Sequence, residues 1–254
     1  MAPEFYRLME GELLNRDYKG MQAVKNFVRA GGVIQPFWGI ASDMHFHNAI
    51  QLGTSVLDVA NDTVDKNKSP VVLYPNAAES PFKNIDSVEQ FADIIEKYWH
   101  ADVYPNIYLP WFAPAFPLLL IRRSSHTGKT TDTLMLEPQV SHMMVKNLVT
   151  LRDNHLFGLS SDFIFKSRYS EKRLPPDILD ALLNEKREEW KKLERKRPDI
   201  YRISTDPAEA EASIRRFHLA EDAKEIPQEY KDEMRQINSI GWGLDRYILA
   251  QVGR

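Results

Sequence analysis

The strongest constraint on the fold is a change in sequence character at about residue 170. Before this point, short apolar runs alternate with stretches of helical spacing. The runs predicted to be strands cover residues 33–40, 70–76, 116–123, 132–138 and 162–168. After this point, apolar residues recur at helical spacing, which predicts helices between the proline pair at 175–176 and Pro198, near 206–222 and near 227–252.

Helices are also predicted in the first half of the chain. Ser87 and Gln90 have the spacing of a capping box, in which two side chains satisfy free N–H groups at a helix start, so we expect a helix over residues 87–99. The pair Gly31-Gly32 is expected to end a helical pattern in residues 3–30. Further helices are expected over residues 44–66 and 140–152.

The order of these elements indicates the fold class. We expect an α/β domain over residues 1–169, with α+β as the open alternative, in which helices flank a small mixed sheet. A predominantly helical extension over residues 170–254 is expected to pack on this domain or on a partner. Its apolar seams are narrow and its remaining faces are charged, which is typical of helices that cover another surface.

Composition excludes several classes of protein. The 254 residues are 43% hydrophobic, enough to build a sizeable core, and the net charge of -3 gives no strong field to attract nucleic acid or an anionic membrane. Cysteine is absent, which excludes disulfides, thiolate nucleophiles and cysteine-ligated metals. The longest apolar run, residues 105–121, contains prolines and is too short to span a bilayer. We expect a soluble, cytoplasmic protein that has no signal peptide and does not associate with membranes.

Asp43, His45 and His47 alternate in the stretch ASDMHFHNAI, residues 41–50. At the end of a strand, all three side chains would point to one face, and two imidazoles with a carboxylate suit zinc or another divalent ion. In the alternative, Asp43 caps a helix that starts at Met44. His45 and His47 would then lie about 200° apart around the helix axis and could not share a metal.

The apolar run followed by Asp43-x-His45-x-His47 resembles the first-strand motif of the amidohydrolases and of the PHP phosphoesterases. These are metal-dependent hydrolases built on barrels. The resemblance covers about fifteen residues. It implies that both histidines bind the metal, that Asp43 binds it or orients a histidine, and that a metal-bound water attacks the substrate. These families take more ligands from later strands, for which Asp162, before a predicted strand, is the candidate here.

Gly128-Lys129-Thr130 follows an apolar strand and invites comparison with a phosphate-binding loop. That motif needs a glycine where this chain has Arg123, and it needs a following helix, whereas a strand is predicted. We therefore interpret the segment as a hairpin loop. Arg122, Arg123 and Lys129 are its candidate anion-binding residues, although a solvated surface loop is the favoured interpretation.

The basic run over residues 191–197 is a candidate nucleic-acid patch. It lies at the C-terminal end of a predicted helix, where cations are favoured by the helix dipole, and glutamates at i,i+3 and i,i+4 neutralise it. Nucleic-acid binding is therefore the less favoured interpretation, and a solvated helix face is preferred.

The Pro-rich segment 105–117 carries aromatic residues that fold onto the core or, if exposed, contact a partner. The candidate partner-binding residues are Tyr108, Trp111, Phe112 and, on the charged helix, Trp190. We therefore expect a non-catalytic binding or assembly protein that acts through its helical C-terminal region and this Pro/aromatic segment. It would use a protein partner or self-association and no cofactor. The alternative is a metal-dependent hydrolase using Asp43, His45 and His47 with a divalent metal such as zinc.

Overall fold

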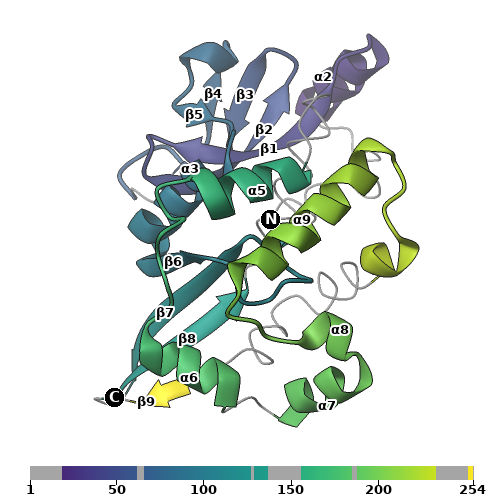
Figure 1. Ribbon diagram of the computed structural model, residues 1–254. Coiled ribbons are helices and arrows are strands. Elements are labelled where there is room, and N and C mark those ends of the chain that lie inside the picture. Colours follow the sequence, from purple (N-terminus) through teal and green to yellow (C-terminus); the bar gives the residue numbers. More distant parts are fainter. Residues whose placement is uncertain are drawn as a thin grey trace. The chain divides into compact units, whose positions relative to one another are not determined.

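The computed structural model describes residues 19–61, 66–126, 129–136, 156–184, 188–232 and 251–253 (Figure 1). The chain divides into two compact units, with unit 1 over residues 1–84 and unit 2 over residues 85–254. The sequence pattern instead predicts a domain boundary after residue 169. The predicted mixed α and β character and the helices of the C-terminal part are confirmed. No helix in the described part of the chain is both long and apolar enough to cross a membrane.

Unit 1 is built on one antiparallel sheet in the order β4-β3-β2-β1-β5. Its strands are β1 (Ile34–Ala41), β2 (His45–Leu52), β3 (Ser55–Asp58), β4 (Val72–Tyr74) and β5 (Phe82–Lys83). The sheet is curled. This is shown by Tyr74 and Phe82, which lie on its two outermost strands and yet have ring centroids only 5.8 Å apart. The predicted strand at 33–40 is confirmed as β1.

The helix predicted over residues 44–66 is wrong. These residues form β2 and β3, joined by a two-residue turn between the paired Leu52 and Ser55. Gly53 occupies this turn at φ +59, a conformation in which a residue with a Cβ is strained. The strand predicted at 70–76 is confirmed as β4, which is a short edge strand with an exposed Leu73.

Helix α2 (Lys19–Arg29) precedes the sheet and ends as the glycine pair predicts. Gly31 adopts φ +87 and its N–H donates to the Val28 carbonyl at 2.9 Å, while the Gly32 N–H donates to the Phe27 carbonyl. These bonds satisfy carbonyl groups that the end of a helix leaves free. The first part of the predicted helical pattern, residues 3–18, lies outside the described residues.

Unit 2 begins with α3 (Val88–Ile94), where the predicted cap by Ser87 is confirmed, although the Gln90 side chain bonds the N–H of Asp86 rather than that of Ser87. The Ser87 hydroxyl accepts from the Gln90 N–H at 3.0 Å, and the Gln90 side chain accepts from the Asp86 N–H at 2.8 Å. The helix continues as a π-helix, η2 (Ile95–Trp99), and ends at His100 in the left-handed region.

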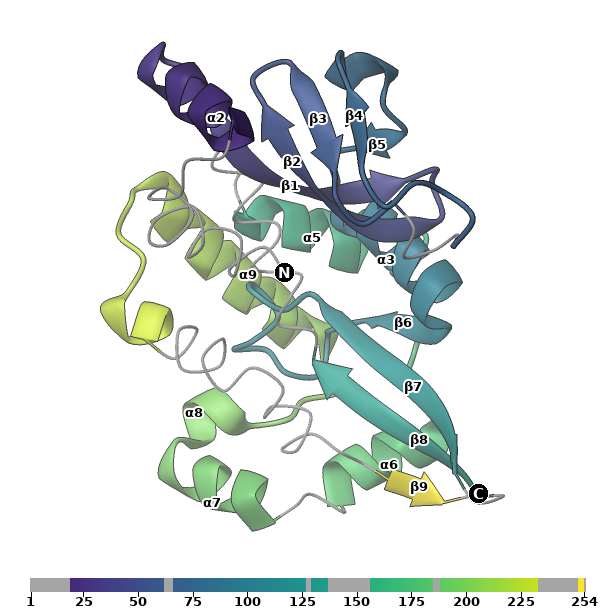
Figure 2. The same cartoon turned by 180° about the vertical axis from the view of Figure 1, so that it is seen from behind.

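A second antiparallel sheet follows, in the order β6-β7-β8-β9. Its strands are β6 (Ala101–Pro105), β7 (Leu118–His126), β8 (Lys129–Leu136) and β9 (Gln251–Gly253). Figure 2 shows β9 beside β8, although the two are far apart in sequence. The predicted helix to residue 252 is therefore wrong at its end, because residues 251–253 pair with β8.

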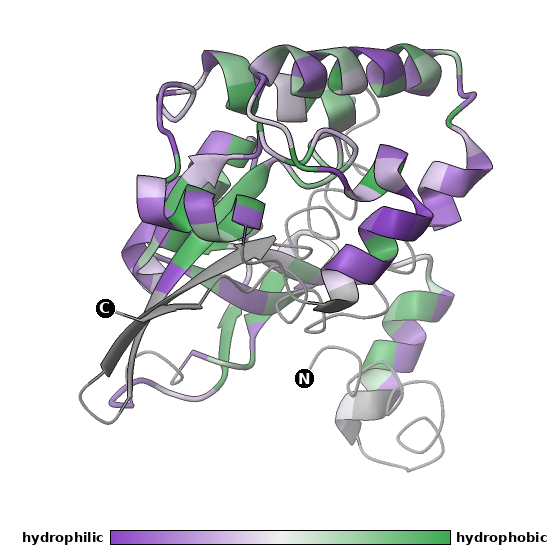
Figure 3. Ribbon diagram, turned by 60° about the horizontal axis from the view of Figure 1, so that its bottom comes forward, coloured by the Kyte–Doolittle hydropathy of each residue, from purple (hydrophilic) through white to green (hydrophobic). Residues whose placement is uncertain are grey.

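After the first strands of this sheet, the described residues of unit 2 include the helices α5 (Leu156–Lys166), α6 (Pro176–Asn184), α7 (Glu188–Lys196), α8 (Pro198–Tyr201) and α9 (Pro207–Asp222). They carry alternating hydrophilic and hydrophobic bands, as expected for helices that cover a core (Figure 3). The strand predicted at 162–168 is wrong, since most of it lies in α5. The buried residues of α5 recur at helical spacing, at Phe157, Ser160, Phe163 and Ile164. The predicted helix at 140–152 lies outside the described residues.

Candidate functional site

The stretch with Asp43, His45 and His47 forms a β-hairpin. Ser42 and Asp43 take left-handed backbone angles, φ 53 and 55, in the turn between the paired residues Ala41 and His45. The helix-cap interpretation is therefore wrong, because β2 begins at His45. His45 and His47 share one face of β2, with ring centroids 6.0 Å apart.

The Asp43 carboxylate forms an ion pair with a lysine and does not join His45 and His47 in a metal site. Its carboxylate oxygens lie 2.7 and 3.0 Å from the Lys83 ammonium, and both side chains are exposed. Asp162, the fourth candidate, lies in α5 of unit 2 and pairs with Lys166 at 2.8 Å. Within the described ranges, no three or more His, Cys, Asp or Glu side chains are arranged to hold a metal ion.

The buried partner of His47 is Asp58, which the sequence analysis missed. His47 Nε2 lies 2.8 Å from Asp58 Oδ1, and the side chains are only 7% and 2% exposed. The same oxygen accepts from the Ala60 N–H at 2.9 Å, and the His47 ring stacks on Phe82 at 5.0 Å. A buried polar pair that is satisfied in this way is typical of a structural element of a core.

His45 lies beside this pair and is half-buried. Burial lowers the pKa of His45, and the neighbouring His47 and Lys68 lower this pKa further. The neutral imidazole is therefore favoured at this position. The pair His47–Asp58 could orient a proton acceptor, but its burial leaves little access for a substrate.

A more accessible feature of unit 1 is an apolar surface at the β4 edge. Val59, Val71 and Leu73 are 37%, 52% and 55% exposed. Leu73 is directly paired with Leu57 of β3, and Val71 stands two residues from Leu73, so both project from the same face. We call Val59, Val71 and Leu73 the edge patch. On its outer side, β4 has no strand partner among the described residues.

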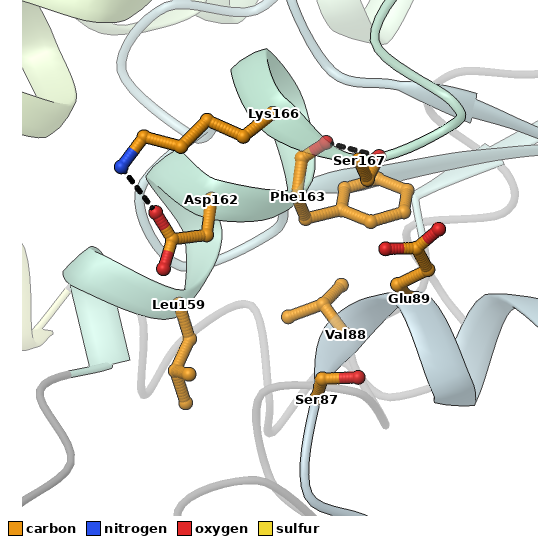
Figure 4. Close-up of a pocket in the computed structure, with 8 residues that line it drawn as sticks. All are labelled: Ser87, Val88, Glu89, Leu159, Asp162, Phe163, Lys166 and Ser167. Carbon is orange, nitrogen blue, oxygen red and sulfur yellow. Dashed lines mark hydrogen bonds and ion pairs between the residues drawn. The ribbon is translucent and has the colours of Figure 1, made fainter.

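Unit 2 contains a pocket of about 180 Å³ between α3 and α5 (Figure 4). Its apolar wall is formed by Val88, Leu159 and Phe163, and its polar lining residues are Ser87, Glu89, Asp162, Lys166 and Ser167. Asp162 and Lys166 pair with each other, and the Ser167 hydroxyl donates to the Phe163 carbonyl. Because Asp162, Lys166 and Ser167 are engaged with α5 or with one another, they offer little recognition to a polar ligand.

A charged network in unit 2 also escaped the sequence analysis. The Tyr169 hydroxyl lies 2.8 Å from Asp93 and 3.0 Å from Glu96, and Lys172 binds Glu96 at 2.6 Å. Burial raises the pKa of Tyr169. Burial also acts to raise the pKa of Glu96, but hydrogen bonds from Lys172 and Tyr169 outweigh it and lower this pKa. The network ties α3 and η2 to the segment after α5, which is a structural role.

The predicted partner-binding aromatics are brought together, but mainly inside the core of unit 2. Tyr108, Phe112 and Trp190 are buried, whereas Trp111 is half-buried against Phe217. Trp190 packs on Phe112, and its indole N–H donates to the Tyr201 carbonyl at 3.1 Å. These three residues therefore belong to the core of unit 2 and do not form an exposed contact surface.

Asn106 explains why the Pro-rich segment folds inward. This residue is fully buried, and its side chain donates to the Phe116 carbonyl at 2.8 Å and accepts from the Leu109 N–H at 3.1 Å. These bonds close the segment into a loop whose aromatic residues face the core.

The segment with Arg122, Arg123 and Lys129 is a hairpin, as predicted. In β7 and β8, Arg123 is paired with Asp132 and His126 with Lys129. A strand at Lys129 rules out the helix that a phosphate-binding loop requires. Anion binding by the three cations stays a prediction.

Comparisons with protein-family models, with curated proteins and with solved structures find no match for this chain.

Proposed function

We propose that the protein is a binding protein that captures an extended segment of a protein partner along β4. The observation that carries this proposal is the edge patch, which combines an outer strand with exposed apolar side chains. An edge strand offers main-chain N–H and C=O groups to an added strand, and side chains at alternate positions give selectivity.

The ends of β4 fit a short interaction of this kind. Pro70 and Pro75 flank the strand, and proline cannot donate to a strand ladder. They limit the pairing edge to the residues between them, which reduces its capacity for uncontrolled aggregation. Such an edge supports the capture of a short peptide segment.

The apolar seams of the C-terminal helices offer less support for partner binding. Trp190 of α7 packs on Phe112, and Phe217 of α9 packs on Trp111, all within unit 2. These contacts support a core role for the apolar seams at Trp190 and Phe217. The proposed surface accordingly moves to unit 1.

The proposal is tested by Leu73→Lys. We expect this charge to reduce retention of the partner at least about tenfold, because it places an ammonium where apolar contact is needed. The matched control is Leu219→Lys, since Leu219 of α9 is 62% exposed and lies in unit 2. Proteins retained from a cell extract are compared by quantitative mass spectrometry. Equal retention by both variants and the natural chain would remove the edge patch from the function.

The metal-dependent hydrolase remains an alternative because His45 and His47 share a face. We expect the purified, untagged protein to contain much less than one zinc, iron or manganese per chain. The reason is that Asp43 is engaged by Lys83 and His47 by Asp58, which leaves too few donors for a closed site. Elemental analysis of the natural chain and of His45→Ala checks this. About one metal per chain, lost in the variant, would favour the hydrolase.

A further inference from the structure

We infer that the captured segment adds to β4 as an antiparallel strand in a single register. In this register, an apolar residue of the segment lies opposite Leu73, and a second apolar residue, two positions later in the segment, lies opposite Val71. This inference rests on the proposed function, because it gives the direction and the residue pattern of a partner for the same strand. It follows from the direction of the main-chain groups of β4, from the groups already engaged at its ends and from its length.

The main-chain groups of Leu73 point away from the sheet. Leu52 and Ser55 are paired across the two-residue turn between β2 and β3, and such a turn closes on a hydrogen-bonded pair. Hydrogen-bonded and non-hydrogen-bonded pairs alternate along an antiparallel ladder. Leu57 therefore directs its N–H and C=O toward β2, and its pair with Leu73 is a non-hydrogen-bonded one. It follows that Leu73 directs its own N–H and C=O toward the open side of β4.

The neighbouring groups on this open side are partly engaged or missing. Val71 and Pro75 stand two residues before and after Leu73, so their main-chain groups face the same way. The Val71 carbonyl already accepts from the Ser69 hydroxyl at 2.9 Å, and Pro75 has no N–H. Within the described ranges, no further hydrogen bond reaches the N–H or C=O of Leu73. One partner residue directly opposite Leu73 can therefore exchange two hydrogen bonds with it.

The exposed side chains of β4 set the residue pattern of the partner. Residues directly opposite each other share a face of a sheet, so partner residues opposite Leu73 and Val71 meet exposed apolar side chains. Every strand pair of this sheet is antiparallel, and antiparallel pairing is slightly more stable than parallel pairing. The partner pattern is therefore apolar-x-apolar. Its first apolar residue donates its N–H to the Leu73 carbonyl, which excludes proline at this position.

The length of β4 favours a peptide over a second copy of the chain. The strand has three residues, which span about 10 Å. Stable protein dimers bury roughly 1,200–2,000 Å², far more than pairing along so short an edge provides. A short linear segment needs only this edge and the edge patch.

The experiment selects binders from a phage-displayed library of random-sequence peptides on the full natural chain and keeps those that Leu73→Lys does not bind. Each residue of one such peptide is then replaced in turn by its N-methyl counterpart, and the affinity is measured by fluorescence anisotropy. We expect N-methylation of the first apolar residue to weaken binding about tenfold, because it removes the donor to the Leu73 carbonyl. N-methylation of the residue between the two apolar ones should have little effect, since its N–H points away from β4.

A variant of the protein tests the same pairing from the other side. Leu73→Pro removes the N–H that faces the open side and leaves the bonds between β3 and β4 in place, as proline on an edge strand can. The matched control is Leu73→Ala, which shortens the side chain and keeps the N–H. We expect the proline variant to bind the peptide about tenfold more weakly than the alanine variant. Amide hydrogen exchange of β3 checks that both variants are folded, and the N-methyl scan decides the question if the proline variant is not.

Two results would overturn this inference and leave the edge patch as the binding surface. In a parallel addition, the essential N–H would belong to the residue after the second apolar one. In binding through side chains alone, N-methylation would be tolerated at every position. A library that yields no Leu73-dependent peptide would overturn both the inference and the proposed function.

Discussion

Replacing Asp58 with alanine is expected to lower the free energy of unfolding of unit 1 by about 3–5 kcal/mol, the range for removing one partner of a buried pair. The change leaves His47 without its partner at 2.8 Å and leaves the Ala60 N–H without its acceptor. Asp58 also pairs in register with Val72 of β4, so the loss should reach the proposed binding edge. Amide hydrogen exchange of β2, β3 and β4 measures the effect.

Two further variants distinguish the contribution of the polar interaction between His47 and Asp58 from that of the volume that their side chains fill. Asp58→Asn keeps an oxygen that can accept from the Ala60 N–H, so we expect a smaller loss than for alanine. His47→Leu combined with Asp58→Leu replaces both polar groups by apolar ones and should recover much of the stability lost in Asp58→Ala. An alanine variant as stable as the natural chain would show that the pair contributes nothing.

Features with a local physical cause were predictable from the sequence. The glycine pair after α2 and the Ser87 cap of α3 act within one helical turn, and both appear as expected. The hairpin at Lys129 was also predictable, because the apolar run after it has strand character. The predictions that failed depend on distant contacts. Residues 251–253 form a strand only because β8 lies beside them, and residues 162–166 are helical because one face of α5 is buried in unit 2.

The candidate site shows the same limit. Alternation along the chain placed His45 and His47 on one face, which the structure confirms. The residue that completes the pair with His47 could not be found in this way. Asp58 lies on the next strand, and its position depends on the turn at Gly53 and on the register of β3 against β2. The edge patch has a similar origin, because Leu73 is exposed only through the place of β4 at the end of the sheet.

Trp190→Ala is expected to destabilise unit 2 by about 3–5 kcal/mol, the range for deleting a large aromatic side chain from a core. The variant loses packing on Phe112 and Tyr201, and it leaves the Tyr201 carbonyl without the indole donor. Trp190→Phe retains most of the packing and should lose only about 1–3 kcal/mol, since it removes the hydrogen bond. Thermal and denaturant unfolding, followed by far-ultraviolet circular dichroism, measure both changes.

Lys192→Ala is the matched control, because Lys192 is exposed on the same helix and its truncation should stay within about 0.5 kcal/mol. The three variants also decide between the two surfaces considered for partner binding. A destabilised Trp190→Ala that still binds at the β4 edge, when assayed at a temperature where it remains folded, agrees with a core role for this side chain. A variant that keeps full stability but loses its partner would return the interaction to α7, where the sequence alone had placed it.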